Sequence, residues 1–160
     1  MTDTEQKTNL VPPVIEIAIS SDRMSASITI LPPPSDASAI DADVIINVQG
    51  DEPLIGEKIL TPLIACFDDS ATDIATAVKR TADEKEIFNE NVVKAVIDAN
   101  GYAMYFSRAT IPHRRKDVTR TPVYFKHIGV YAYRRQVLLD IVKLPPSDYE
   151  SIEMLEQLRW

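Results

Sequence analysis

The sequence predicts an α/β fold in which a mixed sheet is flanked by helices. Residues 44–48 form a short β-branched run that ends abruptly at Gly50, which is typical of a buried strand. Residues 57–67 carry apolar side chains at helical intervals. Asn100 and Gly101 separate two further apolar runs. This dipeptide strongly favours a β-hairpin, because both residues tolerate a positive φ.

Length and composition fit one compact domain. The 160 residues are 45% hydrophobic and 26% charged, which is enough to bury one sizeable core. A net charge of -7 lacks the basic footprint of duplex-binding proteins, so we expect no nucleic-acid partner. The single cysteine, Cys66, cannot form an internal disulfide and is expected to be a buried thiol in a reducing cytosol.

The sequence also bears on membranes. No apolar run approaches the roughly 20 residues of a membrane span, and residues 1–9 lack the apolar core of a secretory signal. We therefore expect a cytoplasmic protein with no membrane association.

The chain is expected to divide near residue 39. Two runs of alternating apolar residues, 15–19 and 26–30, predict a small β unit that turns at residues 20–23. Three prolines and a small polar linker follow it. The prediction is an amino-terminal arm or small β unit with its linker over residues 1–38, and a main domain over residues 39–160.

Further elements are predicted along the main domain. The helix at 57–67 is expected to hold Pro62 near its first turn, where a missing N–H costs little. The remaining predictions are a second buried strand at 73–78, a short helix at 83–88, hairpin strands at 92–97 and 102–106, a strand at 125–133 and a helix at 134–142. Ser147 and Glu150 have the spacing of a capping box, which opens a last helix that is cut short at the end of the chain.

Carboxylates follow the strand at 44–48. In open α/β sheets, ligands gather outside the carboxyl ends of the strands. Asp51 or Glu52 could there hold a hard cation against substrate phosphates, and Gly50 lets a ligand approach the backbone closely. The alternative is a solvated acidic turn.

A second candidate feature lies in the strand at 125–133. His127, Gly129 and Tyr131 share one face of a strand, so Gly129 would leave room for a ligand between two hydrogen-bonding side chains. That arrangement suits a hydroxyl-rich sugar, whereas the alternative is a core histidine bonded to a neighbouring carbonyl. The basic residues 113–116 are expected to form a solvated loop without a catalytic role.

Four segments, in order, resemble the CMP-Kdo synthetases, which are 3-deoxy-manno-octulosonate (Kdo) cytidylyltransferases. They are DVIINVQGDEPL (43–54), IFNENVVKAVIDANGYAMYFSRATIP (87–112), HIGVYAY (127–133) and PPSDYESIEMLEQLR (145–159). The resemblance covers about residues 41–159. It implies a partial Rossmann-like nucleotidyltransferase fold with a β-hairpin extension, preceded by a foreign amino-terminal β segment. The implied reaction converts CTP and Kdo to CMP-Kdo and diphosphate in lipopolysaccharide biosynthesis.

The resemblance also implies roles for seven residues. Asp51 would be the catalytic residue that binds Mg²⁺. The implied substrate-binding residues are Gln49, Arg108, His127, Tyr131, Glu156 and Gln157. Arg108 would hold a phosphate or the Kdo carboxylate, and its alternative role is an ordinary surface ion pair. Gln49, Glu156 and Gln157 could instead simply face solvent.

Two family segments have no counterpart in the sequence. Nothing in residues 1–40 matches the basic loop, roughly IPARxxSxRxPGKPL, whose arginine and lysine hold the triphosphate. No GVDTPEDL-like segment with a second metal-binding aspartate occurs before Trp160. We therefore expect little or no cytidylyltransferase activity from this chain alone. Missing first strands would also expose a parallel sheet edge, which favours a homo-oligomer or a complementing chain.

Three interpretations remain open at this point. The chain is a diverged or truncated Kdo cytidylyltransferase, another sugar nucleotidyltransferase, or a non-enzymatic interaction protein built on a remnant transferase scaffold.

Overall fold

The computed structural model describes residues 42–48 and 55–160 in full, and residues 14–19 and 26–31 as backbone. Its strands are β1 (Val14–Ile19), β2 (Ala26–Leu31), β3 (Val44–Val48), β4 (Ile74–Thr81), β5 (Lys94–Ile97), β6 (Ala103–Ser107) and β7 (Tyr124–Arg134). Its helices are α1 (Glu57–Ala65), α2 (Glu84–Ile87), α3 (Arg135–Ile141) and α4 (Asp148–Glu153), with 3₁₀ turns η2 (Cys66–Asp68) and η3 (Glu156–Leu158). The predicted α/β class is confirmed. No helix of the described residues is long and apolar enough to cross a membrane.

Strand β7 is the spine of the sheet. The strand order is β2-β1-β3-β7-β5-β6, and β4 pairs with β7 as well. Since β4 follows one edge of β7, β3 and β5 share the other edge. A mixed sheet was expected, but all the pairs between described strands are antiparallel.

The amino-terminal hairpin belongs to the same sheet. Strands β1 and β2 pair as predicted, although the turn at residues 20–23 lies outside the described residues. Strand β1 also pairs with β3, from Ile15 opposite Val48 to Ile19 opposite Val44. The exposed parallel edge expected from the missing first strands is not found at β3, because β1 pairs with β3 in the antiparallel direction.

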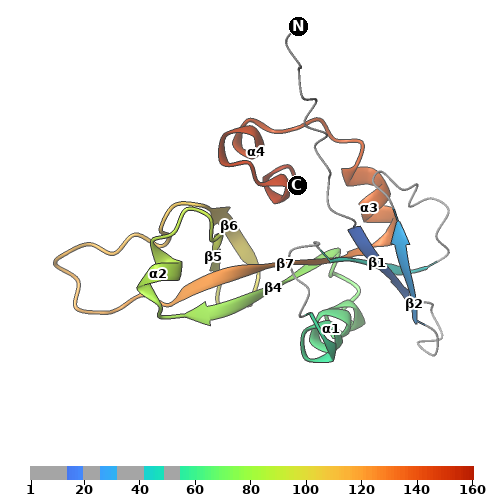
Figure 1. The fold of residues 1–160 in the computed structure, drawn as a ribbon, viewed down its shortest axis with the longest axis horizontal. Helices are drawn as coiled ribbons and strands as arrows, with labels where there is room; N and C mark the ends of the chain where they lie inside the picture. The colour runs from blue at the N-terminus through green and yellow to red at the C-terminus, as the bar shows by residue number, and fades with distance from the viewer. Residues whose placement is uncertain (1–13, 20–25, 32–41, 49–54) are drawn as a thin grey trace, which may run out of the picture.

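Helices cover both faces of the sheet, with α1 on one side and α3 and α4 on the other (Figure 1). The face toward α1 is apolar: Val44, Ile46, Val48, Ala75, Val130 and Ala132 form a buried cluster with Leu63 of α1. On the opposite face, Tyr131 and Tyr133 pack with Ile141 of α3. Because side chains alternate along a strand, consecutive residues of β7 serve two different layers.

Two expectations for α1 are wrong. Pro62 lies inside the helix rather than near its first turn. An interior proline costs about 3 kcal/mol, and burial of Leu63 and its apolar neighbours against the sheet offsets that cost. Cys66 is exposed instead of buried. It begins the 3₁₀ turn η2, where Phe67 takes the next position against the core.

The β-hairpin of β5 and β6 is confirmed, and Gly101 in its turn has a φ of 90°. The second predicted strand is longer than expected and only partly buried, because β4 pairs with β7 alone. The capping box of α4 is present: the Glu150 N–H donates to the Ser147 hydroxyl at 3.1 Å, and the Ser147 N–H donates to the Glu150 carboxylate at 3.2 Å. The last helix does not run to the chain end, because Met154 adopts a left-handed conformation.

Candidate functional site

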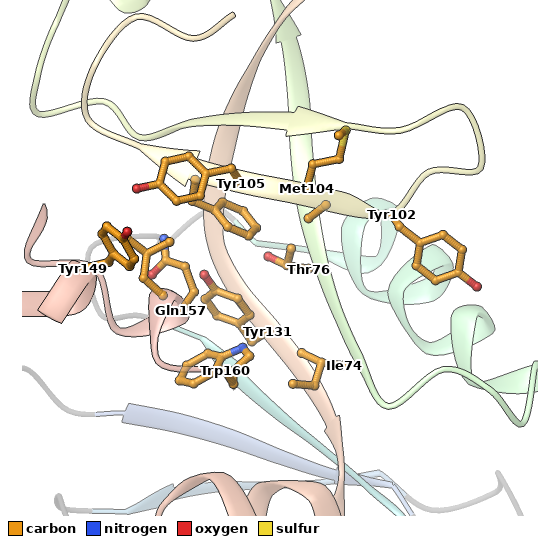
Figure 2. Close-up of a pocket in the computed structure, with 12 residues that line it drawn as sticks. Ile74, Thr76, Tyr102, Met104, Tyr105, Tyr131, Tyr149, Gln157 and Trp160 are labelled. Atoms are coloured by element: carbon orange, nitrogen blue, oxygen red, sulfur yellow. The ribbon is translucent and has the colours of Figure 1, made fainter. Parts of the chain in front are cut away.

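A cavity of about 380 Å³ lies on the face of the sheet opposite α1. Strands β4, β6 and β7 and the segment after α4 enclose it. Its lining residues are Ile74, Thr76, Tyr102, Ala103, Met104, Tyr105, Phe106, Tyr131, Tyr149, Gln157, Leu158 and Trp160. Figure 2 shows Thr76, Tyr131, Gln157 and Trp160 grouped around a common space, while Tyr102 is directed away from it. The cavity thus combines aromatic rings with a few polar groups, as small-molecule sites commonly do.

Tyr131 is the central side chain of this cavity. Its ring stacks on Tyr133 with a centroid distance of 5.9 Å and meets the edge of Trp160 at 6.1 Å. Only 6% of Tyr131 is exposed, and its buried hydroxyl has no hydrogen-bond partner in the described part of the chain. Burial raises the pKa of this phenol, as do the nearby Tyr133 and Glu156. The hydroxyl is therefore a protonated donor at neutral pH.

His127 lies on the same face of β7 as Tyr131, as predicted. However, the two ring centroids are only 5.1 Å apart, and Phe106 meets the imidazole edge-on at the same distance. The rings contact one another, so the expected space for a ligand between them is absent. The partner of His127 is also not the carbonyl considered above, since Nε2 lies 2.8 Å from the Thr76 hydroxyl.

Arg108 is engaged elsewhere. Its guanidinium donates to the carbonyl oxygens of Glu153 at 2.7 Å, Glu90 at 3.2 Å and Met154 at 3.3 Å. At the carbonyls of Glu153 and Met154 this cation caps the carboxyl end of α4. Arg108 does not line the cavity and forms no ion pair with another described residue, so in this structure it joins the hairpin to α4.

Glu156 and Gln157 lie on η3, one turn beyond α4. Gln157 lines the cavity, where its amide can both donate and accept hydrogen bonds. Glu156 is exposed and does not line the cavity, although its negative charge contributes to the raised pKa of Tyr131 and Tyr133. Of the six predicted substrate-binding residues, the structure therefore brings Tyr131 and Gln157 to one cavity, with His127 directly behind it.

The predicted metal ligand cannot be placed. Asp51 and Gln49 both lie outside the described residues. Within residues 42–48 and 55–160, no group of three or more His, Cys, Asp or Glu side chains could hold a metal ion. The roles of Asp51 and Gln49 stay predictions.

Comparison with known proteins identifies the family. A family profile described as Cytidylyltransferase matches residues 15–160. The chain belongs to the cytidylyltransferase family. The match begins inside the hairpin of β1 and β2, within the amino-terminal stretch that the sequence alone sets apart as foreign, so the predicted boundary near residue 39 remains a prediction.

Relatives within the cytidylyltransferase family are similar over most of this chain. The 3-deoxy-manno-octulosonate cytidylyltransferase of Bacteroides thetaiotaomicron is 50% identical over 127 residues, which is 75% of this chain and 51% of that protein. The protein of the same name from Thermodesulfovibrio yellowstonii is 44% identical over 123 residues, or 74% of this chain and 48% of that protein. The chain thus spans about half the length of these relatives.

A solved cytidylyltransferase has a similar fold. The structure of CMP:2-keto-3-deoxy-manno-octonic acid synthetase complexed with CTP superposes with a TM-score of 0.69 at 40% sequence identity. The superposition covers 75% of this chain and 49% of that chain. The family and fold implied by the four sequence segments are therefore confirmed.

The sequence reasoning missed two polar side chains near the site. Thr76 lines the cavity and bonds His127, but a threonine in a strand carries no sequence signal of its own. Lys94 is completely buried at the start of β5. The sequence does carry a signal for it, because Lys94 is the one charged residue within the apolar run 92–97.

His127 predicts a loss of stability in acid. Burial lowers the pKa of His127 to about 4, against 6.5 for an unburied histidine. Below pH 6.5 the unfolded chain binds a proton at His127 that the folded chain does not bind until about pH 4. The contribution of His127 to the free energy of unfolding is therefore complete above pH 6.5 and falls as the pH drops toward 4. The total loss is about 3 kcal/mol. Urea denaturation at pH 7 and at pH 4.5 measures it.

Two variants distinguish the contribution of His127 to this pH dependence from that of carboxyl groups, which titrate over a similar pH range. We expect His127→Gln to flatten this part of the pH dependence, whereas His113→Gln, which replaces the exposed second histidine, leaves it unchanged. Parallel curves for wild type and His127→Gln would show that His127 is hydrated in the folded chain.

Proposed function

We propose that this chain is the acceptor-sugar half of a 3-deoxy-manno-octulosonate cytidylyltransferase. The complete reaction joins the CMP group of CTP to Kdo and releases diphosphate, a step of lipopolysaccharide biosynthesis. Support comes from 44–50% identity to proteins of that name and from the cavity at β7. In the proposal the cavity binds Kdo, and CTP binds beside it.

The buried hydroxyl of Tyr131 carries the proposal. An unpaired polar group in a protein interior costs about 1–3 kcal/mol, so a fold retains one only where something else uses it. Tyr131 lines the cavity, and its buried hydroxyl has no partner among the described residues. A sugar hydroxyl that entered the cavity would supply the missing partner.

The other lining groups fit the same ligand. Gln157 offers an amide oxygen and an amide N–H, which can bond to the hydroxyls of a sugar. Tyr105 and Trp160 provide ring surfaces with polar tips, which suit a molecule that alternates C–H and O–H groups. The lining contains no Lys or Arg among its described members, so the cavity is better suited to a sugar than to a triphosphate.

Mg²⁺ enters the proposal through Asp51, because carboxylate oxygens are the ligands that this ion prefers. When bound, the ion would neutralise phosphate charge on CTP. Asp51 lies outside the described residues, and the described residues hold no group of three or more His, Cys, Asp or Glu side chains that could bind a metal ion. Gln49, the proposed sugar contact, also lies outside the described residues.

Replacing Tyr131 by phenylalanine tests the proposal. The variant keeps the stacked ring and removes only the unpaired hydroxyl. We expect the free energy of unfolding to stay constant or to rise by about 1 kcal/mol, because a buried polar group is lost. In contrast, Kdo affinity should fall about tenfold, because the sugar loses a hydrogen-bond donor. Urea denaturation and calorimetric titration with Kdo give the two values.

The matched control is Tyr124→Phe, since Tyr124 lies at the start of β7 and is not one of the residues that line the cavity. It should change neither value. If wild type binds another acidic sugar but not Kdo, the chain belongs to a different sugar nucleotidyltransferase. If wild type binds no sugar, or if Tyr131→Phe binds Kdo as tightly as wild type, the cavity is not the acceptor site.

A further inference from the structure

The hydrogen bonds of Thr76 fix the position of one proton. Its hydroxyl oxygen lies 2.7 Å from the carbonyl oxygen of Val130 and 2.8 Å from Nε2 of His127. A carbonyl oxygen has no proton to give, so the single hydroxyl proton of Thr76 must point at Val130. The contact with His127 then needs a proton on Nε2, which donates to the Thr76 oxygen.

We infer that Thr76 is a positioning residue for His127: it holds the neutral imidazole in the Nε2–H tautomer, so that Nδ1 is the only ring nitrogen that can accept a hydrogen bond. The inference deepens the proposed function and, for its effect on Kdo, rests on it.

A distortion of the sheet creates this arrangement. Along the β4–β7 pair, Thr76 lies opposite Tyr131, but the next residue, Ala77, lies opposite Ile128. Gly129 and Val130 are therefore extra residues on β7 in this pair. Such a bulge re-aims side chains and is frequent beside functional sites. Here it brings the carbonyl of Val130 and the imidazole of His127 to the same hydroxyl.

The surroundings leave the imidazole little freedom to change. Phe106 meets it edge-on and Tyr131 lies against it, both with centroids 5.1 Å away. Burial holds the ring neutral at physiological pH, with a pKa of about 4. A neutral ring with its Nε2 proton directed at Thr76 cannot donate from Nδ1.

A consequence for ligand choice follows. Nδ1 of His127 can bond only to a group that donates, such as a sugar hydroxyl. It would repel an ionised carboxylate, because both partners would be acceptors. Because Phe106 and Tyr131 lie between His127 and the cavity, the sugar should depend on His127 through the position of these two rings, and its carboxylate should lie elsewhere.

The tautomer can be measured directly in the whole chain by ¹⁵N NMR of the imidazole at pH 7. We expect wild type to show a protonated Nε2 and an unprotonated Nδ1. Thr76→Ser keeps the hydroxyl and should preserve this pattern, whereas Thr76→Val removes it and should shift His127 toward a mixture of tautomers. A protonated Nδ1 in wild type, or the same tautomer in Thr76→Val, would overturn the inference. The wild-type spectrum decides even if Thr76→Val fails to fold.

Kdo titration of the same proteins gives the functional readout. We expect about tenfold weaker binding by Thr76→Val and rescue by Thr76→Ser. The matched control is Thr110→Val, because the Thr110 hydroxyl donates to the carbonyl of Ile87 at 3.0 Å, away from His127. If wild type shows the expected tautomer but binds no Kdo, the proposed function fails while the positioning role of Thr76 stands. If Thr76→Val and wild type bind Kdo equally, Thr76 does not position His127 for the ligand.

Discussion

Replacing Lys94 by methionine is expected to lower the free energy of unfolding by about 3 kcal/mol, because three backbone carbonyl oxygens lose the donor that Lys94 supplies. Lys94 has no exposed surface. Its Nζ donates to the carbonyls of Asn89 at 2.8 Å and Val92 at 2.6 Å, and to that of Arg108. Methionine has a similar length but no donor, so the packing is largely kept while the hydrogen bonds are lost. Urea denaturation followed by Trp160 fluorescence measures the change.

Lys143→Met provides the control for Lys94→Met. Lys143 pairs with Asp140 at 3.0 Å, but both side chains are mostly exposed. Exposed ion pairs contribute about 0–1 kcal/mol, so this substitution should have little effect. Should both lysine substitutions cost the same, water must reach the three carbonyls, and the buried ammonium is not what holds them.

The hydrogen bonds of Lys94 belong to a network that joins the hairpin of β5 and β6 to α4, next to the cavity. Arg108, whose carbonyl accepts from Lys94, donates through its guanidinium to the end of α4. The carboxylate of Glu153 completes the link, since it accepts from the Ser107 hydroxyl at 2.6 Å and from the Arg108 N–H at 2.8 Å. The hairpin is thereby fixed to α4, and the next turn of the chain carries Gln157 to the cavity. The network stabilises the position of a binding residue without touching the ligand.

Local sequence signals predicted the elements of the fold well. The Asn100-Gly101 turn, the strand at 44–48 and the capping box of Ser147 depend on neighbours in the sequence, and the structure confirms all three. Features that depend on distant partners were not accessible in this way. The pairing of β1 with β3 and the burial that retains Pro62 inside α1 are set by contacts across the fold.

The site shows the same division. The spacing of His127 and Tyr131 placed both on one face of a strand, which the ring contact confirms. Gly129 inside the strand is a residue type that often marks a bulge, but the hydrogen bond from His127 to Thr76, 51 residues earlier in the chain, has no sequence signal. Arg108 was predicted from the family pattern, yet in this structure its guanidinium is bonded to backbone carbonyls.

The chain alone is expected to release no diphosphate from CTP, Kdo and magnesium at an enzyme-like rate. Electrostatic stabilisation of the reacting phosphates is usually the largest catalytic contribution, and it needs fixed cations. Residues 1–40 contain no match to the arginine- and lysine-bearing loop of the family, and no Lys or Arg is found among the described residues of the cavity wall. The nearest candidates are occupied: Arg108 by carbonyls, and Arg159 by Glu150.

The turnover assay should be run beside the relative from Bacteroides thetaiotaomicron, which is about twice as long as the region it shares with this chain. Turnover by this chain at roughly 1 per second or faster would contradict the prediction, because that is the range of ordinary enzymes. The informative result is Kdo binding without turnover. It would show that the cavity of Tyr131 and Gln157 recognises its sugar independently of the phosphate-binding groups.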